Sequence, residues 1–111
     1  MAEVMAAPHF AAGAVAFTSG IVNFAPDLVR SVWNAGVSGD FATLNELVAT
    51  KIRPVARLRQ KAPGHHITVV KEAMNLLGLP GGEVRSPLVP LSECDRAELR
   101  QALVDLDLLP A

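Results

Sequence analysis

One short apolar run, Ala14 to Phe17, constrains the fold of this chain more than any other feature of its sequence. A continuous apolar run without polar alternation suits a strand buried on both faces, as in a parallel sheet, or else a segment of buried helix. The remaining sequence offers no second strand to pair with it. Because buried backbone groups without partners are costly, a lone apolar strand implies sheet neighbours that this chain does not supply.

The rest of the chain is predicted to be helical, which gives a fold class of mostly α with one short β-strand. Helices are expected at about residues 2–12, 26–36, 41–62, 68–77 and 93–106. Pro26 suits a first helical turn, and Asp40 and Ser92 suit N-caps. Pro54 should kink the third helix. Residues 79–91 are rich in Pro and Gly and should form an extended crossing segment.

Composition excludes several classes of function. Half of the 111 residues are apolar and the formal net charge is −1, which argues against a disordered tail. Ten Lys and Arg offset by eleven acids leave no basic excess for a nucleic-acid partner. The most apolar stretch, residues 10–26, is interrupted by polar residues and is shorter than the roughly 20 residues of a membrane span. With Glu3 ahead of that stretch and no basic residue before Arg30, the start of the chain does not resemble a signal peptide. We expect a cytoplasmic protein with neither a nucleic-acid nor a membrane partner.

No pattern predicts a metal or a cofactor. Cys94 is the single cysteine, which excludes a Cys-rich zinc site. His65 and His66 are adjacent, so on a helix they do not share a face, and no nearby carboxylate pair completes a site. We expect these histidines to have a structural role.

An ordered series of motifs carries a family resemblance along essentially the whole chain. The series consists of Gly13-Ala-Val-Ala-Phe-Thr-Ser-Gly20, Asn23-Phe-Ala-Pro26, Ser38-Gly-Asp40, Arg53-Pro54, Val69-Val-Lys-Glu-Ala73, Gly78-Leu-Pro-Gly-Gly82, Val84-Arg-Ser-Pro-Leu88, Pro90-Leu-Ser92 and Leu108-Leu109. It resembles the C-terminal part of the dihydrodipicolinate synthase / N-acetylneuraminate lyase family. Within that family, Phe17-Thr-Ser19 with Asn23-Phe24 is most similar to the pattern of 5-dehydro-4-deoxyglucarate dehydratases. Thr18 departs from the dehydratase serine, and Val89-Pro-Leu-Ser92 is closer to synthase-type members.

The resemblance implies the C-terminal portion of a (β/α)8 TIM barrel plus its C-terminal helical extension. Residues 1–37 would form the last βα portion, and residues 38–111 the C-terminal helical region. It also implies a Schiff-base lysine acting on a 2-oxo acid, since an imine is a better electron sink than a ketone. That lysine lies on the sixth strand of the family's barrel and a catalytic tyrosine on the fifth, whereas this chain has no tyrosine and only lysines on or beside predicted helices. We therefore expect a fragment that is inactive alone, holds no catalytic residue and no cofactor, and belongs to a homo-oligomer.

Three functions are compatible with these patterns. The first is dehydration and decarboxylation of 5-dehydro-4-deoxyglucarate to 2,5-dioxopentanoate, in the complete enzyme. The second is 4-hydroxy-tetrahydrodipicolinate synthase or another pyruvate-dependent aldolase of the family. The third is a non-catalytic helical interaction module.

Three polar residues after the apolar run are the candidate substrate-binding residues. Thr18 and Ser19 follow the predicted strand directly, at the end where barrel enzymes place their chemistry. Their hydroxyls can bind a substrate carboxylate or hydroxyl, and Asn23 can orient the loop. The alternative is that all three satisfy the backbone of a turn. Trp33, which shares a helix face with Val29, is expected to be packed.

Overall fold

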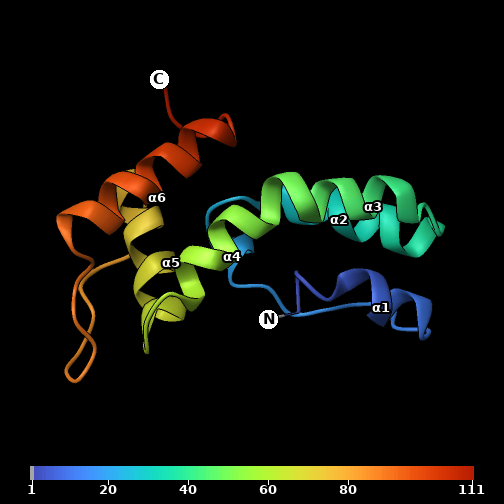
Figure 1. Cartoon of the computed structure of the whole chain (residues 1–111), viewed down its shortest axis with the longest axis horizontal. Helices are drawn as coiled ribbons and strands as arrows, with labels where there is room; N and C mark the ends of the chain where they lie inside the picture. The colour runs from blue at the N-terminus through green and yellow to red at the C-terminus, as the bar shows by residue number, and fades with distance from the viewer. Residues whose placement is uncertain (1) are drawn as a thin grey trace. The chain divides into compact units, whose positions relative to one another are not determined.

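The computed structural model describes residues 2–111, which divide into two compact units, Met1–Ala56 and Arg57–Ala111 (Figure 1). The first unit holds α1 (Ala6–Ala11), the 3-10 helix η1 (Ile21–Asn23), α2 (Pro26–Ser38), α3 (Phe41–Leu47) and the π-helical turn η2 (Val48–Ile52). The second holds α5 (His65–Leu76) and α6 (Glu93–Asp105), and the boundary falls within α4 (Arg53–Gln60). The boundary expected from the resemblance, between residues 37 and 38, marks the end of a barrel element and stays a prediction.

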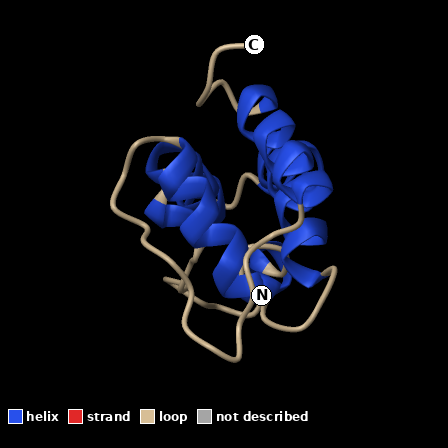
Figure 2. Cartoon of the chain, turned by 90° about the vertical axis from the view of Figure 1, so that its left-hand side faces the viewer, coloured by secondary structure: helices blue, strands red, loops and turns tan. Residues whose placement is uncertain are grey.

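The predicted strand is absent from the part of the chain that the structure describes (Figure 2). Residues 14–19 are extended but belong to no ladder, and the side chain of Val15 is 77% exposed. The prediction of a strand buried on both faces is therefore wrong for this chain. A strand needs hydrogen-bonding partners on a neighbour, and residues 2–111 provide no second strand. The expectation of a mostly helical chain is confirmed.

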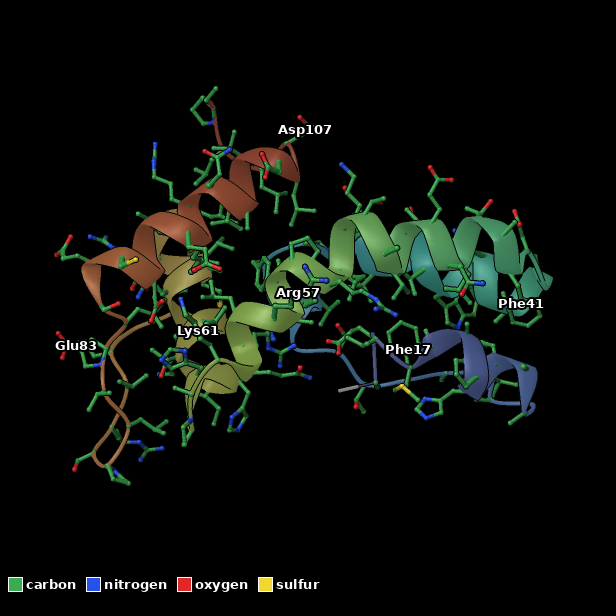
Figure 3. All side chains as sticks on the ribbon, in the orientation of Figure 1. Phe17, Phe41, Arg57, Lys61, Glu83 and Asp107 are labelled. Atoms are coloured by element: carbon green, nitrogen blue, oxygen red, sulfur yellow. The ribbon has the colours of Figure 1, made fainter. Side chains whose placement is uncertain are left out.

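Phe10 anchors the extended segment and α2 to α1 in the first unit. Its buried ring lies against Gly36, where a Cβ atom would overlap the ring carbons. It also meets the ring of Phe17 edge to face, with centroids 5.9 Å apart and an interplanar angle of 87°. Figure 3 labels Phe17 beside α1. One aromatic side chain of α1 thus contacts both α2 and the end of the run from Ala14 to Phe17.

The turn between α2 and α3 follows the predicted capping chemistry. Pro26 occupies the first turn of α2, and the helix ends at Ser38 with Gly39 in the left-handed region at φ 74°. Asp40 then caps α3 by accepting a hydrogen bond from the Thr43 N–H at 3.2 Å. These caps hold α2 and α3 side by side (Figure 1). The predictions for Pro26 and Asp40 are confirmed, and the helix runs two residues beyond Gly36.

The helix type changes just before Pro54, and the kink expected at this proline stays a prediction. Residues 41–60 form α3, η2 and α4 without a break, and the π-helical turn η2 ends two residues before Pro54. Proline has no N–H to donate to the carbonyl four residues earlier, and a wider turn accommodates the missing bond. The apolar side chains buried along these helices are those of Leu44, Val48, Ile52, Val55 and Leu58, whereas Phe41 at the start of α3 is exposed.

Trp33 corrects a sequence expectation, because its side chain is 39% exposed rather than packed. Val29 and Val32 of the same helix are buried, but no segment of residues 2–111 fully covers the indole ring. The indole Nε1 donates a hydrogen bond to the carbonyl oxygen of Val15 at 3.0 Å. Trp33 therefore links α2 to the extended segment instead of filling the core.

The second unit pairs α5 with α6 along a small apolar core of Val69, Ala73, Leu99 and Leu103. Ser92 caps α6 as predicted, and its hydroxyl accepts from the Asp95 N–H at 3.1 Å. The crossing segment, residues 79–91, contains no helix, as expected. Lys71 and Asn75 of α5 bind its backbone at Glu83 and Gly82 with bonds of 2.9 and 3.0 Å. No helix within residues 2–111 is long and apolar enough to cross a membrane.

Candidate functional site

The three predicted site residues lie within one turn that joins the extended segment to α2. Thr18 ends the extended segment, Ser19 follows it, and Asn23 closes η1. The side chains of Thr18 and Asn23 are exposed, and Ser19 is half-buried. The chain therefore brings all three together, but their environments differ.

Ser19 lies in a hydrogen-bonded cluster around a buried carboxylate, that of Glu3. The Glu3 side chain is 2% exposed, and its Oε1 accepts hydrogen bonds from the Ser19 hydroxyl and the Gly20 N–H, both at 2.8 Å. The Ile21 N–H donates to the same oxygen at 3.4 Å. The Ser19 oxygen in turn accepts from the Val22 N–H at 3.2 Å. The carboxylate and the hydroxyl together satisfy the first N–H groups of η1.

Asn23 and Thr18 are bonded more simply. The Asn23 amide nitrogen donates to the Gly20 carbonyl at 3.0 Å, which closes its own turn. Within residues 2–111 the Thr18 hydroxyl makes no hydrogen bond. Of the two candidate hydroxyls, that of Thr18 is the one whose proton is not already donated to a group within residues 2–111.

Glu3 is the residue of this cluster that the sequence prediction missed. It lies sixteen positions before Ser19, so no local spacing connects the two. The sequence feature that could have pointed to Glu3 is its position as a single acidic residue between Ala2 and Val4, in an Ala-rich segment. A carboxylate in such a place needs buried hydrogen-bond donors if the segment packs.

A shallow groove of about 520 Å³ adjoins the turn in the first unit. It is lined by apolar side chains and by two charged ones, Asp27 and Arg30 on α2. The apolar lining comes from Phe17, Val22, Pro26, Val29 and Trp33. The exposed part of Trp33 therefore belongs to the wall of this groove.

The lysines of the chain all lie on helices or turns, and none is on the extended segment. They are Lys51 in η2, Lys61 after α4 and Lys71 in α5. Hydrogen bonds from Lys61 to Asp95 and then to Glu98 raise the pKa of this lysine above its ordinary value (Figure 3 labels Lys61). Since an amine must be neutral to attack a carbonyl, this ion-paired lysine is a poor nucleophile.

Metal binding finds no support in the geometry. Between residues 2 and 111 no three His, Cys, Asp or Glu side chains gather as a metal site requires. His65 is buried at the start of α5, and its Nδ1 lies 3.4 Å from the Leu58 carbonyl oxygen.

Comparison with known proteins supplies the family. Residues 2–106 match the dihydrodipicolinate synthetase family. The chain belongs to this family. The match covers the turn with Thr18, Ser19 and Asn23 as well as Glu3.

Curated relatives carry one name in common. A probable 5-dehydro-4-deoxyglucarate dehydratase 2 of Streptomyces coelicolor is 37% identical over 99% of this chain and 34% of its own length. A probable 5-dehydro-4-deoxyglucarate dehydratase of Acinetobacter baumannii is 32% identical over 95% of this chain and 35% of its own length. The chain thus spans about a third of the length of these relatives.

Solved structures similar to this chain carry the other name of the family. A dihydrodipicolinate synthase from Oceanobacillus iheyensis aligns with a TM-score of 0.89 and 36% identity, over 97% of this chain and 36% of that one. A second structure named dihydrodipicolinate synthase aligns with a TM-score of 0.84 and 29% identity. The fold of this chain therefore matches a part of each of those solved chains.

Proposed function

We propose that this chain is the C-terminal portion of a Schiff-base lyase that acts on 2-oxo acids in a complete, homo-oligomeric barrel enzyme. The proposed reaction is dehydration and decarboxylation of 5-dehydro-4-deoxyglucarate to 2,5-dioxopentanoate. In this enzyme residues 14–17 would pair with neighbouring strands, and Thr18, Ser19 and Asn23 would line the substrate site. The lysine that forms the imine would come from outside residues 1–111.

The observation that carries the proposal is the extended segment, which has no strand partner within residues 2–111 and leads into this polar turn. Residues 14–19 are extended, Val15 is exposed, and the next regular helix is α2. In a parallel barrel, the loop after a strand lies on the face that holds the chemistry. The names of the curated relatives favour the dehydratase over other members of the family.

The second candidate is 4-hydroxy-tetrahydrodipicolinate synthase or another pyruvate-dependent aldolase. It is supported by the two solved structures named dihydrodipicolinate synthase. Both candidates form an imine between a lysine and a 2-oxo acid, and they differ in which 2-oxo acid they act on.

A chimeric barrel tests the proposal. The segment of the Streptomyces coelicolor relative that matches this chain is replaced by the chain, and loss of 5-dehydro-4-deoxyglucarate is measured. We expect turnover well above that of the 111-residue chain alone. A cooperatively folded chimera that traps pyruvate with borohydride but leaves 5-dehydro-4-deoxyglucarate unchanged would favour the aldolase. A folded chimera inactive with both would overturn the lyase proposal.

A further inference from the structure

The cluster around Glu3 fixes the direction of the hydrogen bonds of Ser19. A serine hydroxyl has one proton to donate and two lone pairs that accept. Glu3 Oε1 already accepts from the Gly20 and Ile21 N–H groups, which can only donate. With two N–H groups directed at it, this oxygen is an acceptor toward Ser19 as well. The single hydroxyl proton of Ser19 therefore points to Glu3, over a distance of 2.8 Å.

The hydrogen bonds that Ser19 can still make follow from those that it already makes. One of its lone pairs accepts the Val22 N–H at 3.2 Å. A single acceptor position is left, and no donor. Ser19 can accept a hydrogen bond from a ligand, but it cannot donate one to a carboxylate while Glu3 holds its proton.

We propose that Glu3 is a positioning residue that presents Ser19 to the substrate as a hydrogen-bond acceptor. This inference rests on the proposed function. The neighbouring Thr18 is exposed, and its hydroxyl makes no hydrogen bond in the part of the chain that the structure describes, so it keeps a donor for a carboxylate. Thr18 then donates a hydrogen bond to a substrate carboxylate, and Ser19 accepts one from a substrate hydroxyl.

This assignment selects a chemical class of substrate. An acceptor oxygen beside a buried carboxylate favours a 2-oxo acid that carries hydroxyl groups along its chain. It gives nothing to pyruvate, which carries none. A site built to bond a hydroxyl discriminates against an analogue that lacks it, because the polar groups of the site are then left unpaired.

The functional test compares Glu3→Ala with the matched control Glu3→Gln in the chimeric barrel. Glutamine keeps an acceptor oxygen for Ser19, whereas alanine releases the hydroxyl proton. We expect Glu3→Ala to lower kcat/KM for 5-dehydro-4-deoxyglucarate about tenfold and to leave borohydride trapping of pyruvate within about twofold. Glu3→Gln should stay within about twofold for both compounds. In a Ser19→Ala background, Glu3→Ala should cause no further loss.

Two outcomes would overturn the inference. If Glu3→Ala slowed both compounds equally, Glu3 would merely support the turn. If it slowed neither, Ser19 would not act through Glu3.

A second arm needs no turnover and uses the 111-residue chain. Ser19→Ala should shift the NMR resonances of the Glu3 side-chain carboxyl carbon and of the Val22 N–H, because each loses the hydrogen bond that it makes with Ser19. Unmoved resonances would refute the bonding and thus the inference. A folded wild-type chimera with no turnover would instead overturn the proposed function and, with it, the substrate role of Ser19. The resonances would still show whether Glu3 holds the hydroxyl.

Discussion

At the scale of the residue, Asp40 links the stability of the first unit to pH. Hydrogen bonds from Thr43, through its side chain and its backbone N–H, lower the pKa of Asp40 below 3.8. A depressed pKa in the folded state means that the stabilisation is present above the unfolded pKa and is lost as the pH falls through the folded pKa. We expect Asp40→Asn, which still caps α3, to remove this share of the acid destabilisation. Urea unfolding from pH 6 to pH 2 measures it, and identical pH slopes in both proteins would contradict it.

Gly36 gives a second prediction at this scale. A helical Gly→Ala change normally gains up to about 1 kcal/mol, but here the new methyl group overlaps the Phe10 ring. We expect Gly36→Ala to destabilise the chain by about 1–3 kcal/mol, the usual range for overpacking. In a Phe10→Ala background the same change should become stabilising. Denaturant unfolding of the four proteins checks the pair, and a stabilising single variant would show that the ring moves freely.

At the scale of the element, the start of α6 depends on one hydroxyl. Ser92 accepts from the Asp95 N–H, so Ser92→Ala leaves that donor without its cap. Loss of an N-cap costs about 1 kcal/mol, and Ser92→Asp should retain nearly all of the stability. Thermal unfolding followed by circular dichroism measures both variants. Equal loss in the two would mean that capping does not hold α6.

The extended segment gives another prediction at the scale of the element. Without a ladder, the N–H groups of residues 15–18 should exchange with solvent quickly in the isolated chain. In the chimeric barrel, strand partners should slow the same N–H groups by orders of magnitude. Hydrogen exchange followed by mass spectrometry compares the two. Equal exchange would show that residues 14–17 form no strand even with the rest of a barrel present.

At the scale of the whole molecule, capping and the buried faces of the helices were predictable, whereas contacts between residues remote in sequence were not. Pro26, Asp40 and Ser92 occupy the helix starts expected from their side chains, because capping depends on residues a few positions apart. The prediction of a strand was wrong because a ladder needs a second strand, which residues 2–111 do not provide. The prediction that Trp33 is packed was wrong because no other segment of residues 2–111 covers its ring fully. For the same reason the carboxylate of Glu3, remote in sequence from Ser19, was found only in the structure.

We propose that this chain completes a Schiff-base lyase whose nucleophilic lysine lies outside residues 1–111. Borohydride trapping with pyruvate and with 5-dehydro-4-deoxyglucarate, followed by peptide mass spectrometry, locates that lysine. We expect no adduct on the 111-residue chain with either compound. In the chimeric barrel we expect one adduct, on a lysine outside residues 1–111. A reproducible adduct on Lys51, Lys61 or Lys71 in either protein would show that this chain supplies the nucleophile itself.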